Sequence, residues 1–289
     1  MGLLSDSLIP GTDFSPSDVK WTWFRDRVLA PWIVGPVTRL NPRWPGYGEA
    51  IDVPAADWDV LVILDACRAD VFEETADLEV FDDYQRVVSR GSHSSEWIRR
   101  NFGGGSFGDT VYVSANPHTN LVAHDAFHDI LELWDTHYDE ETGTVLPADV
   151  VEAARDADEM YPDKRLIVHF MQPHGPLIGS DESVPFDSNE AYWRAYTETL
   201  KYVLPYAMEI ADTIQGKTVL TADHGQINYD GVWRHLGLKS HKPRLRLPGL
   251  VEVPWAVLED NRRPVRTEAV DIGSQDNVED RLRDLGYVT

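Results

Sequence analysis

Short apolar runs rich in β-branched residues recur along the chain and alternate with segments of helical spacing. The runs predict strands at Asp59–Asp65, Arg86–Ser89, Thr110–Ala115, Arg165–Gln172, Lys217–Asp223 and Val251–Leu258. Helical spacing or helix-start signals mark the segments Arg68–Thr75, Ser94–Asn101, Pro147–Met160, Asn189–Ile214 and Asn277–Leu285. Strands that alternate with helices indicate an α/β fold with a mostly parallel central sheet and helices on both faces.

The organisation of the chain predicts one domain rather than two. The candidate strands are spread through the sequence, and no Gly/Ser-rich or Pro-rich linker divides it. We assign residues 51–289 to this domain and residues 1–50 to an N-terminal arm that is partly packed on it. In the arm, Trp21–Leu40 is rich in Trp, Val and Leu, but its charges and prolines argue against a transmembrane segment. Peripheral contact with a membrane stays open as the alternative.

The charge balance of the 289 residues narrows the range of partners. The net charge is −23, and Arg supplies most of the positive charge. This composition resembles proteins of halophilic archaea; an ordinary acidic mesophilic protein is the alternative. Nucleic acid is not expected as a partner, because binding a polyanion normally requires a basic stripe. A small anionic ester or glycan substrate would need local cations, which directs attention to metal ions.

The number of cysteines and the N-terminal residues help to predict the cellular compartment of the protein. Cys67 is the only cysteine, so no intrachain disulfide can form. The first residues contain neither a basic region followed by a long apolar run nor a small-residue cleavage site. We therefore expect a cytoplasmic protein.

Polar residues at the ends of two predicted strands carry the first candidate chemistry. Asp65 ends the first run, and Asp223 with His224 ends the fifth. Ligands of open α/β sheets bind outside the carboxyl ends of the strands, so these side chains are expected to meet there. Carboxylate with imidazole suits Zn or Mn, and a carboxylate-dominated site suits Mg or Ca. For Asp65 alone, capping of the following helix is an equal alternative.

Three hydroxyls stand at the start of the second predicted helix, in the sequence GSHSSEW. These are Ser92, Ser94 and Ser95. Backbone N–H groups and the helix dipole stabilise an anion at such a position, and a serine coordinated to a metal could attack phosphorus or sulfur. The competing interpretation is plain N-capping by Ser94 or Ser95.

Histidines near two other strands extend the candidate site. His169 and His174 lie at the end of the fourth run, and His241 precedes the last one. Each could be a second-metal ligand, a hydrogen-bond donor to a substrate oxygen or a general acid, and a structural role is equally open for each. The stretch FGGGSFGD is a turn rather than a phosphate loop, because it lacks the GK[ST] ending.

The order of these motifs resembles the alkaline phosphatase superfamily, in particular its sulfatase-like branch. The resemblance runs from about Asp59 to the C-terminus, where VEDRLRDLGYV looks like a closing helix of that branch. It implies an α/β/α sandwich in which one or two divalent ions are bound, with Asp65, Ser94, Asp223 and His224 as ligands. Ser94 would be the nucleophile, because GSHSSEW is similar to an archaeal sulfatase-like pattern in which Gly-Ser-x-Thr precedes Pro-Glu-Trp; Ser92 and Ser95 remain alternatives.

The resemblance also assigns catalytic roles outside the metal ligands. His174 and His241 match positions that face the substrate or a second metal. Arg68 would hold a non-bridging substrate oxygen or pair with an acidic neighbour. One departure matters: the C/S-x-P-x-R sequence that yields formylglycine is absent from Ser92–Glu96, and Cys67 stands elsewhere. An unmodified serine favours phosphate over sulfate esters.

These observations predict a metal-dependent hydrolase that cleaves a phosphate or sulfate ester through Ser94. One alternative is a phospho-group transferase or mutase acting on a sugar or lipid-linked glycan. In that case the aromatic residues of Trp21–Trp32, Trp193 and Trp233 could stack on sugars, although such residues are more often core. Another alternative is a non-catalytic protein that binds an anion or glycan and retains the fold.

Overall fold

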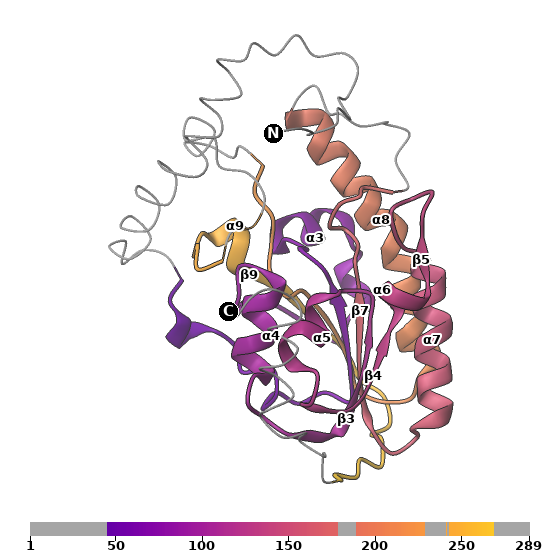
Figure 1. Cartoon of the computed structure of the whole chain (residues 1–289). Coiled ribbons are helices and arrows are strands. Elements are labelled where there is room, and N and C mark those ends of the chain that lie inside the picture. Colours follow the sequence, from indigo (N-terminus) through magenta and orange to yellow (C-terminus); the bar gives the residue numbers. More distant parts are fainter. Residues whose placement is uncertain (1–44, 179–188, 229–240, 242, 269–289) are drawn as a thin grey trace, which may run out of the picture.

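A seven-stranded sheet forms the centre of the computed structural model, which describes residues 45–178, 189–228, 241 and 243–268 (Figure 1). The strand order is β2 (Asp83–Val88), β9 (Glu252–Leu258), β8 (Thr218–Thr221), β1 (Val60–Leu64), β7 (Arg165–Phe170), β3 (Phe107–Ser114) and β4 (Phe127–Glu132). Strand β9 pairs antiparallel with both neighbours, and the remaining pairs are parallel. The predicted mostly parallel α/β fold is confirmed.

The register of the central strands decides where the polar strand ends meet. Strand β1 pairs with β7 from Val60↔Leu166 to Leu64↔Phe170, and with β8 from Val60↔Thr218 to Ile63↔Thr221. All five residues of β1 are buried, as expected for an apolar parallel strand covered on both faces. The residues that follow β1 and β8 therefore leave the sheet side by side at its carboxyl edge.

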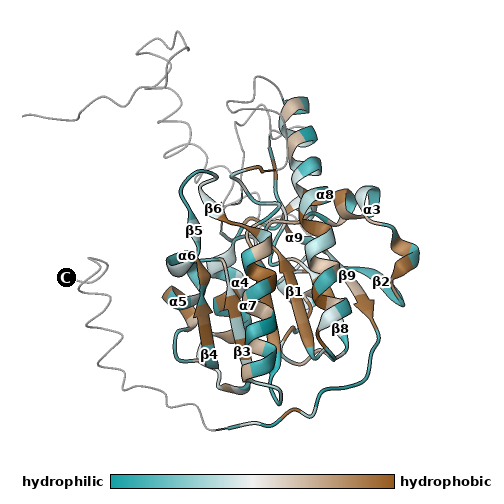
Figure 2. Cartoon of the chain, turned by 90° about the vertical axis from the view of Figure 1, so that its right-hand side faces the viewer, coloured by the Kyte–Doolittle hydropathy of each residue, from teal (hydrophilic) through white to brown (hydrophobic). Residues whose placement is uncertain are grey.

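Helices cover both faces of the sheet, as predicted. Helices α3 (Ala69–Thr75), α7 (Pro147–Met160) and α8 (Asn189–Thr213) share one hydrophobic core with the alternate β1 residues Val60, Val62 and Leu64. Helix α4 (Ser94–Phe102) and the short α5 (His118–Ala123) share the other core with Leu61 and Ile63. Figure 2 shows the apolar strands between helices whose polar sides face outward.

Several small elements were missed in the sequence. They are β4, α5, the two-stranded sheet of β5 (Tyr138–Asp139) and β6 (Thr144–Val145), helices α6 (Leu133–Thr136) and α9 (Pro248–Val251), and the 3₁₀ turns Tyr47–Glu49 and Leu78–Val80. Strand β4 is an edge strand with five half-buried residues out of six, so it lacks the continuous apolar run that identified the inner strands. The predicted helix Asn277–Leu285, most of the arm and Trp233 lie outside the described residues.

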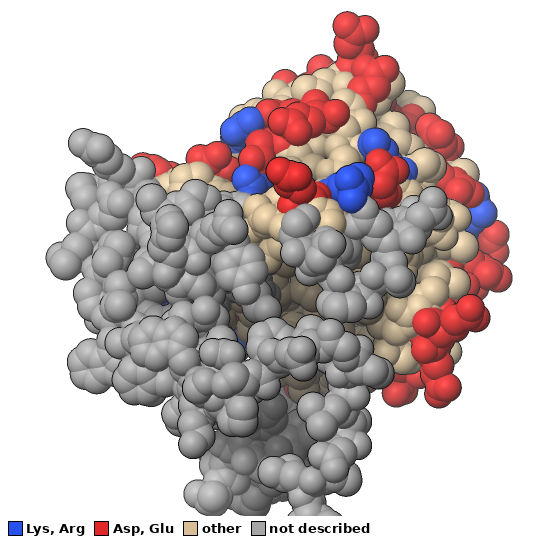
Figure 3. Space-filling model, turned by 90° about the horizontal axis from the view of Figure 1, so that it is seen from above, with Lys and Arg blue, Asp and Glu red and all other residues tan. Residues whose placement is uncertain are grey.

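The described end of the arm packs on the domain beside α4. Ala50 forms a parallel β-bridge with Val88, and the Tyr47 hydroxyl donates to Glu96 at 2.7 Å. Carboxylates outnumber Lys and Arg on the described part of the upper face in Figure 3. Among the helices that the structure describes, none combines the length and the apolar character needed to cross a bilayer.

Candidate metal centre and nucleophile

A strained turn after β1 places Asp65 beside the end of β8. Ala66 has a φ of 61°, in the left-handed region that costs a non-glycine residue about 1 kcal/mol. Two hydrogen bonds hold this conformation: the Ala66 amide donates to Oδ1 of Asp223 at 3.1 Å, and the Tyr196 hydroxyl donates to the Ala66 carbonyl at 2.6 Å. The turn that carries one candidate ligand is therefore tied to the other.

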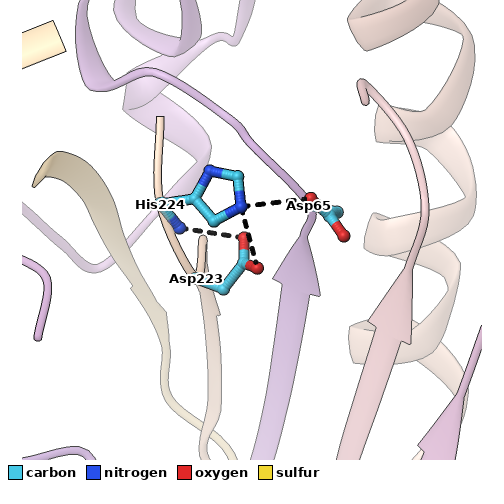
Figure 4. A group of neighbouring side chains, drawn as sticks. All are labelled: Asp65, Asp223 and His224. Atoms are coloured by element: carbon cyan, nitrogen blue, oxygen red, sulfur yellow. Dashed lines mark hydrogen bonds and ion pairs between the residues drawn. The ribbon is translucent and has the colours of Figure 1, made fainter. Parts of the chain in front are cut away.

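Asp65, Asp223 and His224 form one buried cluster (Figure 4). One ligand atom from each of the three lies within 4.8 Å of the others, and no side chain is more than 2% exposed. Nε2 of His224 is 3.4 Å from Oδ2 of Asp223 and 3.7 Å from Oδ1 of Asp65. Neither of these two oxygens has a hydrogen-bond partner among the described residues. Three predicted ligands are thus brought together.

The hydrogen bonds around the cluster make it suited to a divalent cation. Nδ1 of His224 donates to the Gly225 carbonyl at 2.7 Å, so Nε2 presents its lone pair to the two free carboxylate oxygens. Burial opposes ionisation of Asp65, but the neighbouring histidines His169, His174 and His224 lower its pKa. Buried lone pairs that face one another repel unless a cation lies between them. Two carboxylates and an imidazole fit Zn or Mn in particular.

Ser94 is the first residue of α4 and faces this cluster. Its Oγ lies 3.2 Å from Nε2 of His224 and 3.5 Å from Oδ2 of Asp65, and the residue is 3% exposed. The alternative that Ser94 or Ser95 caps α4 is wrong, and so is the alternative that Asp65 caps α3. The N-cap of α4 is His93, whose Nδ1 accepts the Ser95 amide at 3.1 Å, and the N-cap of α3 is Arg68, without a side-chain bond.

The other two hydroxyls of the GSHSSEW sequence are used elsewhere. Ser92 Oγ hydrogen-bonds Glu96 at 3.1 Å and accepts the Leu245 amide at 3.1 Å. Ser95 Oγ lies 3.0 Å from Nδ1 of His93. Neither has an Oγ contact with the three candidate ligands in the part of the chain that the structure describes. Of the three serines, Ser94 is the one beside the cluster.

Two glycines allow the backbone to approach closely at the site. A Cβ on Gly91 would lie 2.6 Å from the Trp97 amide, so glycine lets the loop pack against the first turn of α4. A Cβ on Gly225 would lie 2.3 Å from the Gly249 carbonyl, directly after the candidate ligand His224. Both positions require glycine because backbone occupies the space of a side chain.

His174 and His241 also meet at this end of the sheet, as expected from the sequence. Their Nε2 atoms are 2.8 Å apart, and the His241 ring centroid is 4.5 Å from that of His224. The His174 amide donates to the Asp65 carbonyl at 3.0 Å. Burial lowers the pKa of His241 to about 2, and the neighbouring His224 and His174 rings add to this effect. His241 is therefore neutral at pH 7.

Arg68 takes the second of its two predicted roles, pairing with an acidic neighbour. Its Nε and an Nη donate to Asp70 at 2.8 and 2.6 Å, and another Nη donates to the Gln226 carbonyl. The guanidinium stacks over Trp193, with Cζ 4.8 Å from the ring centroid. These bonds fix the loop after β1 against the loop after β8.

Sequence reasoning missed Asn116 and His93. Asn116 follows β3, and its amide donates to Oδ2 of Asp65 at 2.6 Å. The rule that polar strand ends meet at the site would have selected it. The His93 ring lies 5.0 Å from that of His118 and 4.9 Å from that of His241. No pattern marks His93, because an imidazole is an unusual N-cap.

Comparison with known proteins shows similarity of fold and does not establish a reaction. No family model matches the chain, and no curated protein matches it. The integral membrane protein lipooligosaccharide phosphoethanolamine transferase A from Neisseria meningitidis is 15% identical with a TM-score of 0.51, covering 83% of this chain and 58% of that one. Its soluble domain gives 15% identity and a TM-score of 0.49, covering 72% and 78%.

A protein in the alkaline phosphatase superfamily from Vibrio parahaemolyticus is 12% identical with a TM-score of 0.41, covering 71% of this chain and 60% of that one. At these identities the shared property is the fold alone. The chain spans 58% of the length of the full transferase.

Proposed function

We propose that this chain is a metal-dependent enzyme that cleaves a phosphate ester through a covalent phospho-Ser94 and passes the phospho-group to an acceptor. The position of Ser94 Oγ carries the proposal: it lies 3.2 Å from Nε2 of His224, beside two buried carboxylates with free oxygens. A set of binding side chains this complete argues against a protein that only binds an anion or glycan.

In the first half-reaction, the metal ligands, helix α4 and Ser94 have different roles. A divalent cation held by Asp65, Asp223 and His224 would lower the pKa of the Ser94 hydroxyl and offset charge on the phosphoryl oxygens. Because Ser94 is the first residue of α4, the positive end of the helix dipole lies at the nucleophile and would stabilise negative charge there. Ser94 Oγ forms a bond to phosphorus, the ester P–O bond breaks, the serine proton goes to water, and the leaving oxygen takes a proton from water.

The second half-reaction returns Ser94 to its free form. The acceptor hydroxyl loses its proton to water as its oxygen bonds to phosphorus, the Ser94 Oγ–P bond breaks, and Oγ regains a proton from water. Nδ1 of His241 is buried and has no partner among the described residues, so it is placed to accept a hydrogen bond from the acceptor hydroxyl. His174 would hold that ring in place through the 2.8 Å Nε2 contact.

Transfer to an alcohol is the favoured outcome, and hydrolysis is the alternative. The fold is similar to that of a phosphoethanolamine transferase, which supports an acceptor other than water. A sugar or lipid-linked glycan is the acceptor class that we propose. Sulfate esters are disfavoured, because the sequence around Ser94 does not contain the formylglycine motif. A cytoplasmic location, a halophilic origin and peripheral membrane contact stay predictions.

The test measures the covalent intermediate and the product separately. The protein is incubated with Zn²⁺ or Mn²⁺ and an aryl phosphomonoester, an aryl phosphodiester or an aryl sulfate, with and without glycerol or glucose. We expect phosphate on Ser94 by peptide mass spectrometry, no turnover by Ser94→Ala, and ordinary turnover by the neighbouring control Ser95→Ala. Phosphoglycerol or phosphoglucose identifies a transferase, and free phosphate alone a hydrolase. Turnover retained in Ser94→Ala would refute the nucleophile.

A further inference from the structure

Two buried polar side chains behind Asp65 have no part in the reaction described above. Tyr112 lies on β3 and His169 on β7, and these strands follow β1 in the sheet order. The Tyr112 hydroxyl is 2.8 Å from Nδ1 of His169, and Nε2 of His169 is 3.7 Å from Oδ2 of Asp65. None of the three residues is more than 1% exposed. Buried polar groups are costly unless they are paired, so this row needs a reason.

The direction of the hydrogen bonds in this row follows from chemistry. Burial raises the pKa of Tyr112 well above its ordinary value, so its hydroxyl keeps its proton. If His169 carried its proton on Nδ1, the Nε2 lone pair would face the Asp65 carboxylate in a medium without water. With the proton on Nε2, the Tyr112 hydroxyl donates to Nδ1, and Nε2–H faces Oδ2 of Asp65 at 3.7 Å, beyond ordinary hydrogen-bond distance. The second arrangement pairs Nδ1 and places a donor rather than a lone pair opposite the carboxylate.

The two oxygens of Asp65 then have different roles. Oδ2 receives the Asn116 amide at 2.6 Å, lies 3.5 Å from Ser94 Oγ and faces Nε2 of His169 at 3.7 Å. Oδ1 has no partner among the described residues and lies 3.7 Å from Nε2 of His224. Oδ2 is therefore held by side chains of the described residues, and Oδ1 is left without a partner beside His224, where the candidate cation would lie.

Packing keeps the His169 ring in this orientation. Its centroid is 6.0 Å from that of Tyr112 and 6.4 Å from that of Trp97, which meets it edge-on. Trp97 belongs to α4, the helix that begins with Ser94. The same ring that faces Asp65 therefore also packs against the helix of the nucleophile.

We propose that Tyr112 and His169 are positioning residues: the Tyr112 hydroxyl sets the tautomer of His169, whose Nε2–H orients Asp65 so that Oδ1 is presented to the cation. The tautomer rests on the contacts within this row and on the retained proton of Tyr112, and the effect on cation binding rests on the proposed function. Partners of this kind typically contribute 10- to 100-fold, roughly, to metal affinity.

The first arm of the test reads the tautomer without metal or substrate. In ¹⁵N-imidazole NMR of the full chain in chelator, His169 should show a protonated Nε2 and an unprotonated Nδ1, assigned by its absence in His169→Gln. Tyr112→Phe should shift the Nδ1 signal, whereas Tyr84→Phe, which removes a hydroxyl that binds Glu73, should leave it unchanged. A proton on Nδ1 would overturn the proposal whatever the enzyme activity.

The second arm measures Zn²⁺ binding by calorimetry on folded variants. His169→Leu should weaken binding by about 10- to 100-fold, and His169→Gln, whose amide can donate from nearly the same position as Nε2, should restore most of it. Equal losses in the Leu and Gln variants, or unchanged affinity in a folded Leu variant, would overturn the positioning role. If the wild-type protein binds no divalent cation while the Nε2–H tautomer is present, the proposed function fails and the hydrogen-bond row stands.

Discussion

Nε2 of His224 lies 3.4 Å from Oδ2 of Asp223, and the Nδ1–H bond to the Gly225 carbonyl directs the imidazole lone pair at that oxygen. Both groups are fully buried, so water cannot screen the contact. An acceptor facing an acceptor in the interior raises the free energy of the folded state. A cation between them converts the same arrangement into a stabilising one.

Divalent cations should therefore raise the melting temperature of the wild-type protein. At a cation concentration of 100 times Kd, the gain in the free energy of unfolding is about 2.7 kcal/mol. Asp223→Asn should lose this gain, and in chelator it should be at least as stable as the wild type, because one buried charge is removed. Thermal unfolding with Zn²⁺, Mn²⁺ or EDTA measures both effects. The surface variant Asp52→Asn is the control, and a wild-type melting temperature that no cation changes would contradict the expectation.

Much of the fold and site could be predicted because the relevant signals are local. The inner strands are buried and mostly apolar; Asp65 follows β1 directly, and Asp223 and His224 come one residue after the end of β8. Parallel strands bring their carboxyl ends to one edge, so two strand-end positions far apart in the sequence share a site. The alternation of strands and helices was enough to specify this geometry.

The selection of one hydroxyl among three depends on contacts that the sequence pattern does not show. Ser92 is engaged by Glu96 and by the Leu245 amide, a partner 153 residues away. His93 caps α4 and so leaves Ser94 free to face His224. Capping preferences would have assigned the cap to a serine. The strand β4 escaped detection for another reason, since its half-buried residues carry no clear period.

Glu96→Gln should destabilise the loop that precedes Ser94. The Glu96 carboxylate accepts the Tyr47 hydroxyl at 2.7 Å, the Arg100 Nε at 2.9 Å and the Arg244 amide at 2.8 Å, in addition to Ser92. A Gln amide group turns a donor toward one of these donors. We expect a loss of about 2 kcal/mol in the free energy of unfolding, because bonds to a charged acceptor are each worth about 1.5–3 kcal/mol.

Urea unfolding provides the measurement, and Glu73→Gln is the matched control. Glu73 also binds a tyrosine and an arginine, Tyr84 and Arg86, but it does so at the surface. Exposed pairs of this kind contribute at most about 1 kcal/mol. Similar losses for the two variants would mean that Glu96 has no special place in the loop.

Acidification should destabilise the metal-free protein through His93. Burial, followed by the charges of His224 and His118, lowers the pKa of His93 from 6.5 to about 4. Between these values the unfolded chain binds a proton that the folded chain does not. The contribution of His93 to the free energy of unfolding is therefore constant above about pH 6.5 and falls as the pH is lowered towards 4.

Urea unfolding in chelator at several pH values from 7 to 5 checks this expectation. His93→Asn retains an N-cap acceptor and should show a shallower pH dependence than the wild type. His118 and His241, whose pKa values are also lowered by burial, should account for part of the slope that remains. His137→Asn, at an exposed position, should keep the wild-type slope. A His93→Asn slope equal to that of the wild type would exclude His93 as a source.

Gly225→Ala should disturb the candidate ligand that it follows. The new Cβ would lie 2.3 Å from the Gly249 carbonyl, and backbone on both sides must move to relieve the contact. Overpacking of this kind costs about 1–3 kcal/mol. Because His224 precedes Gly225 and bonds to its carbonyl, Zn²⁺ affinity should fall together with stability. Gly48→Ala adds a methyl group where no atom lies within 4 Å, so it should leave both quantities unchanged. Calorimetry measures the Zn²⁺ affinity of the two variants, and thermal unfolding measures their stability. A Gly225→Ala protein with wild-type stability and cation affinity would show that the close approach of Gly225 to the Gly249 carbonyl is not required.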